Sequence, residues 1–317
     1  MASQQEELSW VDAAKRRWGY RYERFQRGWD QFTTHRLGVV GILILVVFML
    51  WALFPSVFAP HPVNWKAFVG TEGGYLTAEQ IRSMPHPPAF GDPFFAPLGT
   101  NYNGYGILTE LVYSARTALY IGFAAGVLSS LVGVPLGLIS GYYGDTWIDE
   151  TIQRIADIMY SLPFLPLVVV LVAIRGITTT NIILAIVVKS WINNCIVIRG
   201  ETLSLRENAY VDSAKVSGAS DTRIVFRHIL PHVLPLSFVY LAQDAAAAIL
   251  TQAGLAYLGL ADFTAHSWGL MLQQIQSQGY VFSAWWWLIP PGIAITLVAA
   301  AFYFIGFSME DVANPQR

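Results

Sequence analysis

Six long apolar runs dominate this sequence of 317 residues. They cover residues 37–55, 117–140, 156–174, 180–198, 233–258 and 285–307. A helix needs about 20 apolar residues to cross the hydrocarbon core of a bilayer. Only 13% of the residues are charged, against roughly 25% in a soluble domain, so these runs cannot all be core helices of a soluble protein. The sequence predicts an all-α integral membrane protein with about six transmembrane helices.

The lysines and arginines predict the orientation of these helices, because cytoplasmic flanks are enriched in both residue types. The loop over 56–107 holds only Lys66 and Arg82. The segment before the first run is strongly basic, with Lys15, Arg16, Arg17, Arg21, Arg24, Arg27 and Arg36. The connection between the fourth and fifth runs is basic too. Both termini are therefore predicted to be cytoplasmic (N-in/C-in).

These features divide the chain into segments. Residues 1–36 form a cytoplasmic or interfacial region, whose aromatic residues recur at helical spacing beside a basic face. This pattern predicts an amphipathic helix lying on membrane lipid, or one packed on a partner subunit. The remaining segments are a first transmembrane helix at 37–55, an external loop at 56–107, a five-helix transmembrane core at 108–310 with a cytoplasmic connector at 200–231, and a cytoplasmic tail at 311–317.

The connector is the most informative segment, reading RENAYVDSAKVSGASDTRIVFRHILPHVLP from Arg206 to Pro235. A first short helix is predicted to end at Gly218, the residue type best suited to a left-handed cap. Ser220 can begin a second helix, which should stop before Pro231. Small residues along the first helix would let a partner surface approach the backbone. The connector is therefore predicted to be a two-helix docking segment.

This connector resembles the EAA loop of binding-protein-dependent ABC importer permeases, in particular the dipeptide, oligopeptide and nickel (DppC/OppC-like) group. In that group the loop docks into a cleft on a cytoplasmic ATPase. The resemblance implies that ATPase coupling involves Glu207, Ala209, Tyr210, Asp212, Ser213, Ala214, Gly218, Ala219, Ser220, His228, Leu230 and Pro231.

The resemblance extends over most of the chain. It includes Leu98-Gly99-Thr100, Tyr113–Leu119, Gly141-Tyr142-Tyr143-Gly144, Tyr257–Leu260 and Ser267-Trp268-Gly269. The sequence departs from the usual pattern at Asn101 and at Tyr105-Gly106, where the group carries an acidic residue and an Arg-Asp pair. These departures lie on the predicted external side, where they would bear on the binding protein or the cargo.

The resemblance implies a type I ABC importer permease fold in a bacterial or archaeal cytoplasmic membrane. The implied partners are a second homologous permease, two cytoplasmic ATPase subunits, which would bind ATP and magnesium, and an extracytoplasmic substrate-binding protein. The implied cargo is di- or oligopeptides, with nickel complexes or oligosaccharides as alternatives. No nucleic-acid partner is predicted.

Polar residues inside the predicted spans are candidates for the translocation pathway, since ionisable groups in a membrane are costly. Gln243 and Asp244 lie in the middle of the fifth run, and Lys189 and Asn193 lie in the fourth. Asp244 could line the passage or pair with a residue of the partner permease. Lys189 and Asn193 admit the same two readings.

Several classes of activity are not supported by the sequence. No lysine stands in the glycine frame of a phosphate-binding loop, and no catalytic motif is present. The chain is therefore predicted to be a non-catalytic subunit that binds no cofactor or metal. An ion-coupled secondary transporter is the alternative of another class, although such proteins are expected to show internal repeats.

Overall fold

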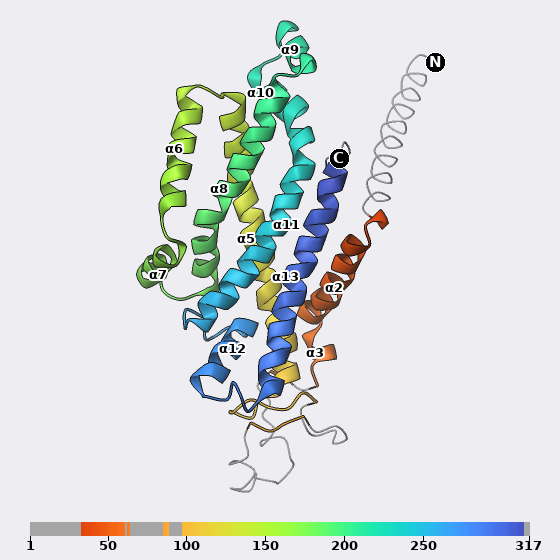
Figure 1. Cartoon of the computed structure of the whole chain (residues 1–317), viewed down its shortest axis with the longest axis vertical. Coiled ribbons are helices and arrows are strands. Elements are labelled where there is room, and N and C mark those ends of the chain that lie inside the picture. The colour runs from red at the N-terminus through yellow and green to blue at the C-terminus, as the bar shows by residue number, and fades with distance from the viewer. Residues whose placement is uncertain (1–32, 61, 64–84, 89–96, 314–317) are drawn as a thin grey trace, which may run out of the picture.

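The computed structural model describes residues 33–60, 62–63, 85–88 and 97–313. Long helices run side by side along one axis of this part of the chain (Figure 1). They are α2 (Arg36–Leu53), α5 (Ile107–Tyr142), α8 (Thr179–Arg206), α11 (Leu230–Tyr257) and α13 (Trp285–Ala313). Five helical segments among the described residues are long and apolar enough to cross a membrane, or up to six if a bent pair counts as one span. The prediction of an all-helical protein with five or six candidate membrane spans is confirmed for the described residues.

The bent pair replaces the third predicted span. Residues 156–174 do not form one helix: α6 (Trp147–Ser161) and α7 (Phe164–Arg175) meet at 91°. The break falls at Leu162-Pro163, where Leu162 has an extended backbone. A residue before proline is driven out of the helical region by the proline ring. Both helices stand at one side of the bundle, with α2 at the other (Figure 1).

Several predicted boundaries shift in the structure. The helix α8 continues to Arg206, so the connector begins at Glu207 rather than at residue 200, and α13 runs beyond residue 310 into the predicted tail. The four remaining short α-helices are α3 (Pro55–Phe58), α9 (Ala209–Val216), α10 (Asp221–Ile224) and α12 (Trp268–Ser277). Of these, α3 and α12 were not predicted. The predicted interfacial helix within 1–36 and much of the loop at 56–107 lie outside the described residues.

Glycines on α5 bring its neighbours into close contact. Two of them face α11 and three face α8, each set spaced four residues apart: Gly122 and Gly126, then Gly133, Gly137 and Gly141. A Cβ added at any of these positions would lie only 2.5–2.8 Å from an atom of the facing helix. Lipid tails are as apolar as the side chains, so no hydrophobic force drives helices together inside a membrane. Helix packing there depends on close approach of the backbones, which small residues allow. The glycine rows therefore fix α5 at the centre of the bundle.

Candidate functional site

The candidate docking segment, Glu207–Pro231, is called the bracket here, and it stands at one end of the bundle (Figure 1). Its first helix, α9, ends in a tight reversal at Gly218, whose φ is +77°. The amide of Gly218 donates to the Lys215 carbonyl at 2.9 Å, and the amide of Ala219 donates to the Ala214 carbonyl at 3.0 Å. These two bonds complete the hydrogen-bond pattern of a left-handed helix cap. The predicted cap at Gly218 is confirmed.

The second helix of the bracket differs from the prediction. Ser220 occupies the position before α10, but its side chain makes no capping hydrogen bond. The helix does not stop before Pro231. It passes through a π-helical turn, η1 (Val225–Ile229), directly into α11, and the Leu230 amide donates to the Val225 carbonyl. Pro231 is then the second residue of α11, and the helix continues past it without a break.

The bracket is packed onto the helix ends beneath it. Val211, Ile224 and Ile229 are fully buried in a cluster that also holds Ile198 of α8. The predicted coupling residues lie mostly on the outer surface. Those exposed are Glu207, Ala209, Tyr210, Asp212, Ser213, Gly218, Ser220 and Pro231, and those half-buried are Ala214, Ala219, His228 and Leu230. Val216, near the tip, is 90% exposed.

Polar contacts tie the bracket to the turn after α5. The Tyr142 hydroxyl donates to one carboxylate oxygen of Asp221 at 2.7 Å, and the Tyr143 hydroxyl donates to the other at 3.2 Å. Desolvation and the Asp221 carboxylate raise the pKa of Tyr143, so its hydroxyl remains a donor. From α8, Arg206 donates to the Tyr142 and Gly144 carbonyls. Sequence reasoning missed these contacts, which join residues more than 60 positions apart.

A buried ion pair joins α6 to α8 nearby. The Arg199 guanidinium binds both carboxylate oxygens of Asp149, through Nε at 2.7 Å and Nη2 at 2.6 Å. Ser140 of α5 also donates to this carboxylate. The Asp149 side chain is only 6% exposed and that of Arg199 is 28% exposed. The pair therefore holds three helices together near the bracket.

Three of the four predicted pathway residues line one cavity of about 340 Å³ between α8, α11 and α13. They are Asn193, Gln243 and Asp244. Asp244 is nearly buried, and its carboxylate accepts a hydrogen bond of 2.7 Å from the Asn194 amide. This partner belongs to the same chain and was not predicted, because Asn194 lies 50 residues away.

Lys189 lies away from that cavity. Its ammonium group donates to the Leu162 and Tyr160 carbonyls at the end of α6, and it stands 5.8 Å from the Tyr160 ring centroid. Cations are favoured near carbonyls that a helix terminus leaves unpaired. The contacts of Lys189 thus support the bend between α6 and α7. No group of three or more His, Cys, Asp or Glu side chains within the described residues could hold a metal ion.

Comparison with known families assigns most of the chain. The family described as "Binding-protein-dependent transport system inner membrane component" matches residues 133–317, more than half of the sequence. The family described as "N-terminal TM domain of oligopeptide transport permease C" matches residues 23–74. The two matched segments include the first predicted span, the bracket and the polar cavity.

Individual relatives agree with the family match. The dipeptide transport system permease protein DppC of Alkalihalophilus pseudofirmus is 33% identical over 92% of this chain and 90% of its own length. OppC of Bacillus subtilis, an oligopeptide transport system permease protein, is 31% identical over 90% of this chain and 88% of its own. GsiD of Pectobacterium atrosepticum, a glutathione transport system permease protein, is 33% identical over 91% of this chain and 90% of its own length.

A solved structure matches the fold alone. A chain of the inward-facing MetNI methionine ABC transporter aligns with a TM-score of 0.52 and 20% identity, covering 66% of this chain and 97% of its own.

Dependence on a binding protein, which the family description states, argues against an ion-coupled secondary transporter. The chain belongs to the family of binding-protein-dependent transport system inner membrane components and is a non-catalytic permease of the DppC/OppC-like group.

Proposed function

We propose that this chain forms half of the pathway of an ATP-driven peptide importer with a type I fold. A second homologous permease would complete the pathway. Two ATPase subunits, which would themselves bind ATP and magnesium, would dock on the brackets of the two permeases, and an external binding protein would deliver cargo. The basic N-terminal segment supports an orientation with both termini in the cytoplasm. The relatives named for dipeptides, oligopeptides and glutathione support a peptide cargo.

The observation that carries this proposal is the geometry of the bracket. Its first helix, α9, stands at the end of the bundle (Figure 1) and carries two exposed side chains, Val216 at 90% and Tyr210 at 39%. The resemblance to the EAA loop supports reading them as part of a contact with a partner protein. Behind the tip, the buried cluster and the contacts to Asp221 attach the bracket to α5, α8 and α11. A push on the tip would therefore reach the helices that line the polar cavity.

The cavity around Asp244 suits a passage for peptides. Asp244 and Gln243 present polar groups to it from α11, Asn193 does so from α8, and Tyr303 lines it from α13. Acceptor and donor groups of this kind could exchange hydrogen bonds with a peptide backbone. An ionisable group within spanning helices is expected to mark a transport path. Lys189 would act structurally at the bend of α6 and α7 instead.

Reconstitution of the complete complex in liposomes tests the function. Uptake of a labelled tripeptide should require the ATPases, ATP and the binding protein together. The chain purified alone should hydrolyse no ATP above a mock preparation. Uptake driven by a proton or sodium gradient without the ATPases would contradict the proposal.

Replacing Gly218 with glutamine should uncouple ATP hydrolysis from uptake. A non-glycine residue in the left-handed conformation costs about 1–2 kcal/mol, so the turn between α9 and α10 should open and displace the tip. We expect peptide uptake per ATP hydrolysed to fall about 5- to 30-fold, the range to which this cost corresponds. The amount of the variant in the membrane should stay unchanged.

Gly279 offers a matched control, since it has the same φ of +77° and also has open space around its Cα. It follows α12 at the other end of the bundle (Figure 1). Gly279→Gln introduces the same local strain away from the bracket and should keep the coupling ratio. Equal losses in both variants would show that general strain, rather than bracket geometry, caused the defect.

A further inference from the structure

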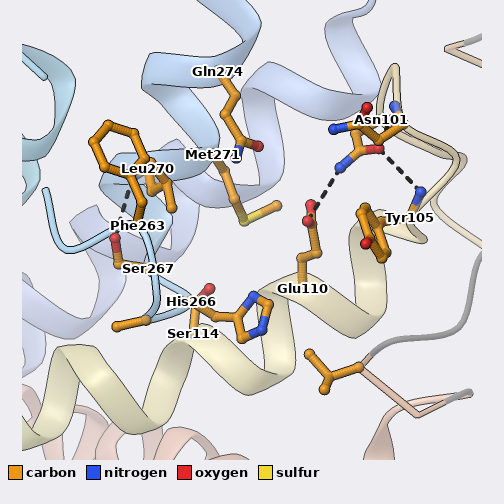
Figure 2. A pocket seen from close by; sticks show the side chains of 13 residues that line it. Asn101, Tyr105, Glu110, Ser114, Phe263, His266, Ser267, Leu270, Met271 and Gln274 are labelled. Carbon is orange, nitrogen blue, oxygen red and sulfur yellow. Dashed lines mark hydrogen bonds between the residues drawn. The ribbon is translucent and has the colours of Figure 1, made fainter.

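A polar pocket lies at the end of the bundle opposite the bracket, between the start of α5 and α12 (Figure 1). Its volume is about 130 Å³. Side chains converge on it from the turn before α5, from the first turns of α5, from the loop after α11 and from α12 (Figure 2). Neither the coupling contacts nor the cavity around Asp244 include these residues.

The Glu110 carboxylate lies in this pocket, and only one of its two oxygens accepts a hydrogen bond within the described structure. Glu110 is only 8% exposed. One carboxylate oxygen accepts a hydrogen bond of 3.1 Å from the Asn101 amide nitrogen, whereas the other, Oε2, is buried and has no donor among the described residues. No lysine or arginine in the described part of the chain forms an ion pair with it. Such a group is costly to bury unless something pairs with it.

The structure holds this carboxylate in place through Asn101. The Asn101 side-chain oxygen accepts hydrogen bonds from the Asn103 and Tyr105 amides at 2.9 and 3.0 Å. These bonds fix which end of the Asn101 amide faces Glu110, because only its NH₂ group can donate to a carboxylate. Asn101 and Tyr105 are also positions at which we expect this sequence to differ from the DppC/OppC-like group. The turn that they form gives Glu110 a fixed support.

The other described residues of the lining include apolar and polar side chains, and no lysine or arginine is among them. The Ser114 hydroxyl, one turn beyond Glu110, is fully buried and has no partner in the described structure. His266 faces the pocket from the loop after α11 (Figure 2), and burial lowers its pKa, so its ring is neutral at pH 7. Gln274 adds an amide, and Met271 a thioether, from α12. The pocket thus offers acceptors and one uncompensated carboxylate.

We propose that this pocket binds a primary ammonium group, with Glu110 as its counter-ion. An ammonium group has three N–H donors, which the Glu110 carboxylate, the Ser114 hydroxyl and the Gln274 carbonyl can accept. A volume of about 130 Å³ equals about four water molecules at roughly 30 Å³ each, which is enough for an aminoethyl group. A divalent metal is less suited, since Glu110 and His266 are its only strong ligands in the lining.

Two sources of this ammonium group fit the position of the pocket. With the orientation proposed above, the pocket faces the outside, where it could receive the free amino terminus of a cargo peptide or a lysine side chain of the binding protein. Only the external position of the pocket rests on the proposed function. Binding of a small amine can be measured without transport, so the ammonium site and the proposed transport function can fail separately.

The test uses ethylammonium chloride as the probe and the complete complex in nanodiscs. A ligand that binds only the folded state stabilises it by RT ln(1 + L/Kd), where L is the free ligand concentration, so the unfolding midpoint rises with that concentration and reports the apparent affinity. Ethylammonium should raise the unfolding midpoint of the permease, and Glu110→Gln should weaken the apparent affinity at least about tenfold, as expected for loss of a charge-assisted hydrogen bond. Glu110→Gln keeps the side-chain shape and an acceptor for Asn101. Ser114→Ala, which leaves the carboxylate in place, should give a smaller loss.

Glu150→Gln is the matched control, because Glu150 is 75% exposed on α6 and makes only a surface ion pair; its response should equal that of the wild type. Tetramethylammonium and potassium carry the same charge but no N–H donors and should give no shift. An equal response to either ion, or an unchanged response in both Glu110→Gln and Ser114→Ala, would overturn the proposal.

The same assay separates the two sources, and a response to either one supports the proposal. A tripeptide amide that shifts the midpoint only when its amino terminus is free identifies cargo. A shift produced by the cargo-free binding protein, and lost when its lysines are acetylated, identifies a docking lysine.

Discussion

Replacing Gly137 with valine is expected to abolish assembly of a heat-resistant permease. A Cβ at this position would lie 2.6 Å from the Cys195 carbonyl oxygen and 2.9 Å from the Ile198 Cβ. Neither atom is the free end of a flexible side chain, so α5 and α8 would have to separate. Overpacking of a core typically costs 1–3 kcal/mol or more, and here the separation would also disturb the Asp149–Arg199 ion pair. The apparent unfolding midpoint and the monodisperse fraction after heating measure the effect.

Gly200, in the C-terminal part of α8, provides the control for this change. A Cβ added there would meet no atom within 4 Å, and glycine inside a helix is itself unfavourable by roughly 1 kcal/mol. Gly200→Val should therefore keep wild-type heat resistance and uptake. Wild-type heat resistance in Gly137→Val as well would mean that α5 and α8 do not approach as closely as the structure shows.

Removing one member of the Asp149–Arg199 pair is the second change with a large expected effect. Breaking a fully buried ion pair costs about 3–5 kcal/mol, because the remaining charge stays buried without a partner; Arg199 is 28% exposed, so we expect a loss toward the lower end of this range. Arg199→Met should therefore lower the unfolding midpoint strongly and reduce the amount of folded permease. Replacing both residues with methionine should recover part of the loss, since no charge is then left unpaired. Recovery should be incomplete because Ser140 and the Asp145 amide lose their acceptor.

The exposed pair Arg154–Glu150 allows a direct comparison. Its members are 3.5 Å apart and 70% and 75% exposed, and pairs of this kind contribute about 0–1 kcal/mol. Arg154→Met should leave the unfolding midpoint almost unchanged. If Arg199→Met behaved in the same way, Asp149 and Arg199 would not be paired in the folded protein.

The sequence alone determined the features that depend on nearby residues. Each apolar run is about as long as a bilayer-spanning helix, because the thickness of the bilayer is fixed. Five of the six runs, 37–55, 117–140, 180–198, 233–258 and 285–307, fall almost entirely within one helix each. The reversal at Gly218 was predictable because it also depends on nearby residues. It needs only one residue with a left-handed backbone and two local hydrogen bonds. The connector motif, also local, pointed to the family.

Other features were present in the sequence as local signals but were decided by their context. Pro163 breaks the third run into two helices, whereas Pro231 lies within a continuous helix. Pro135 and Pro235 also lie inside continuous helices, so the presence of a proline does not by itself decide whether a helix breaks. The glycines of α5 recur every four residues, a known packing signal, but their spacing does not say which helix each row faces.

Only the tertiary structure decided the polar contacts that matter for function. Asp149 meets Arg199, and Asn194 meets Asp244, across 50 residues of sequence in each case. Hydrogen bonds act over about 3 Å, so such partners depend on how helices are rotated and offset against one another. Sequence periodicity gives the face of a helix but not its neighbour. The placement of Asp244 in a cavity, of Lys189 at a helix end and of Glu110 in a half-satisfied pocket therefore had to come from the packed bundle.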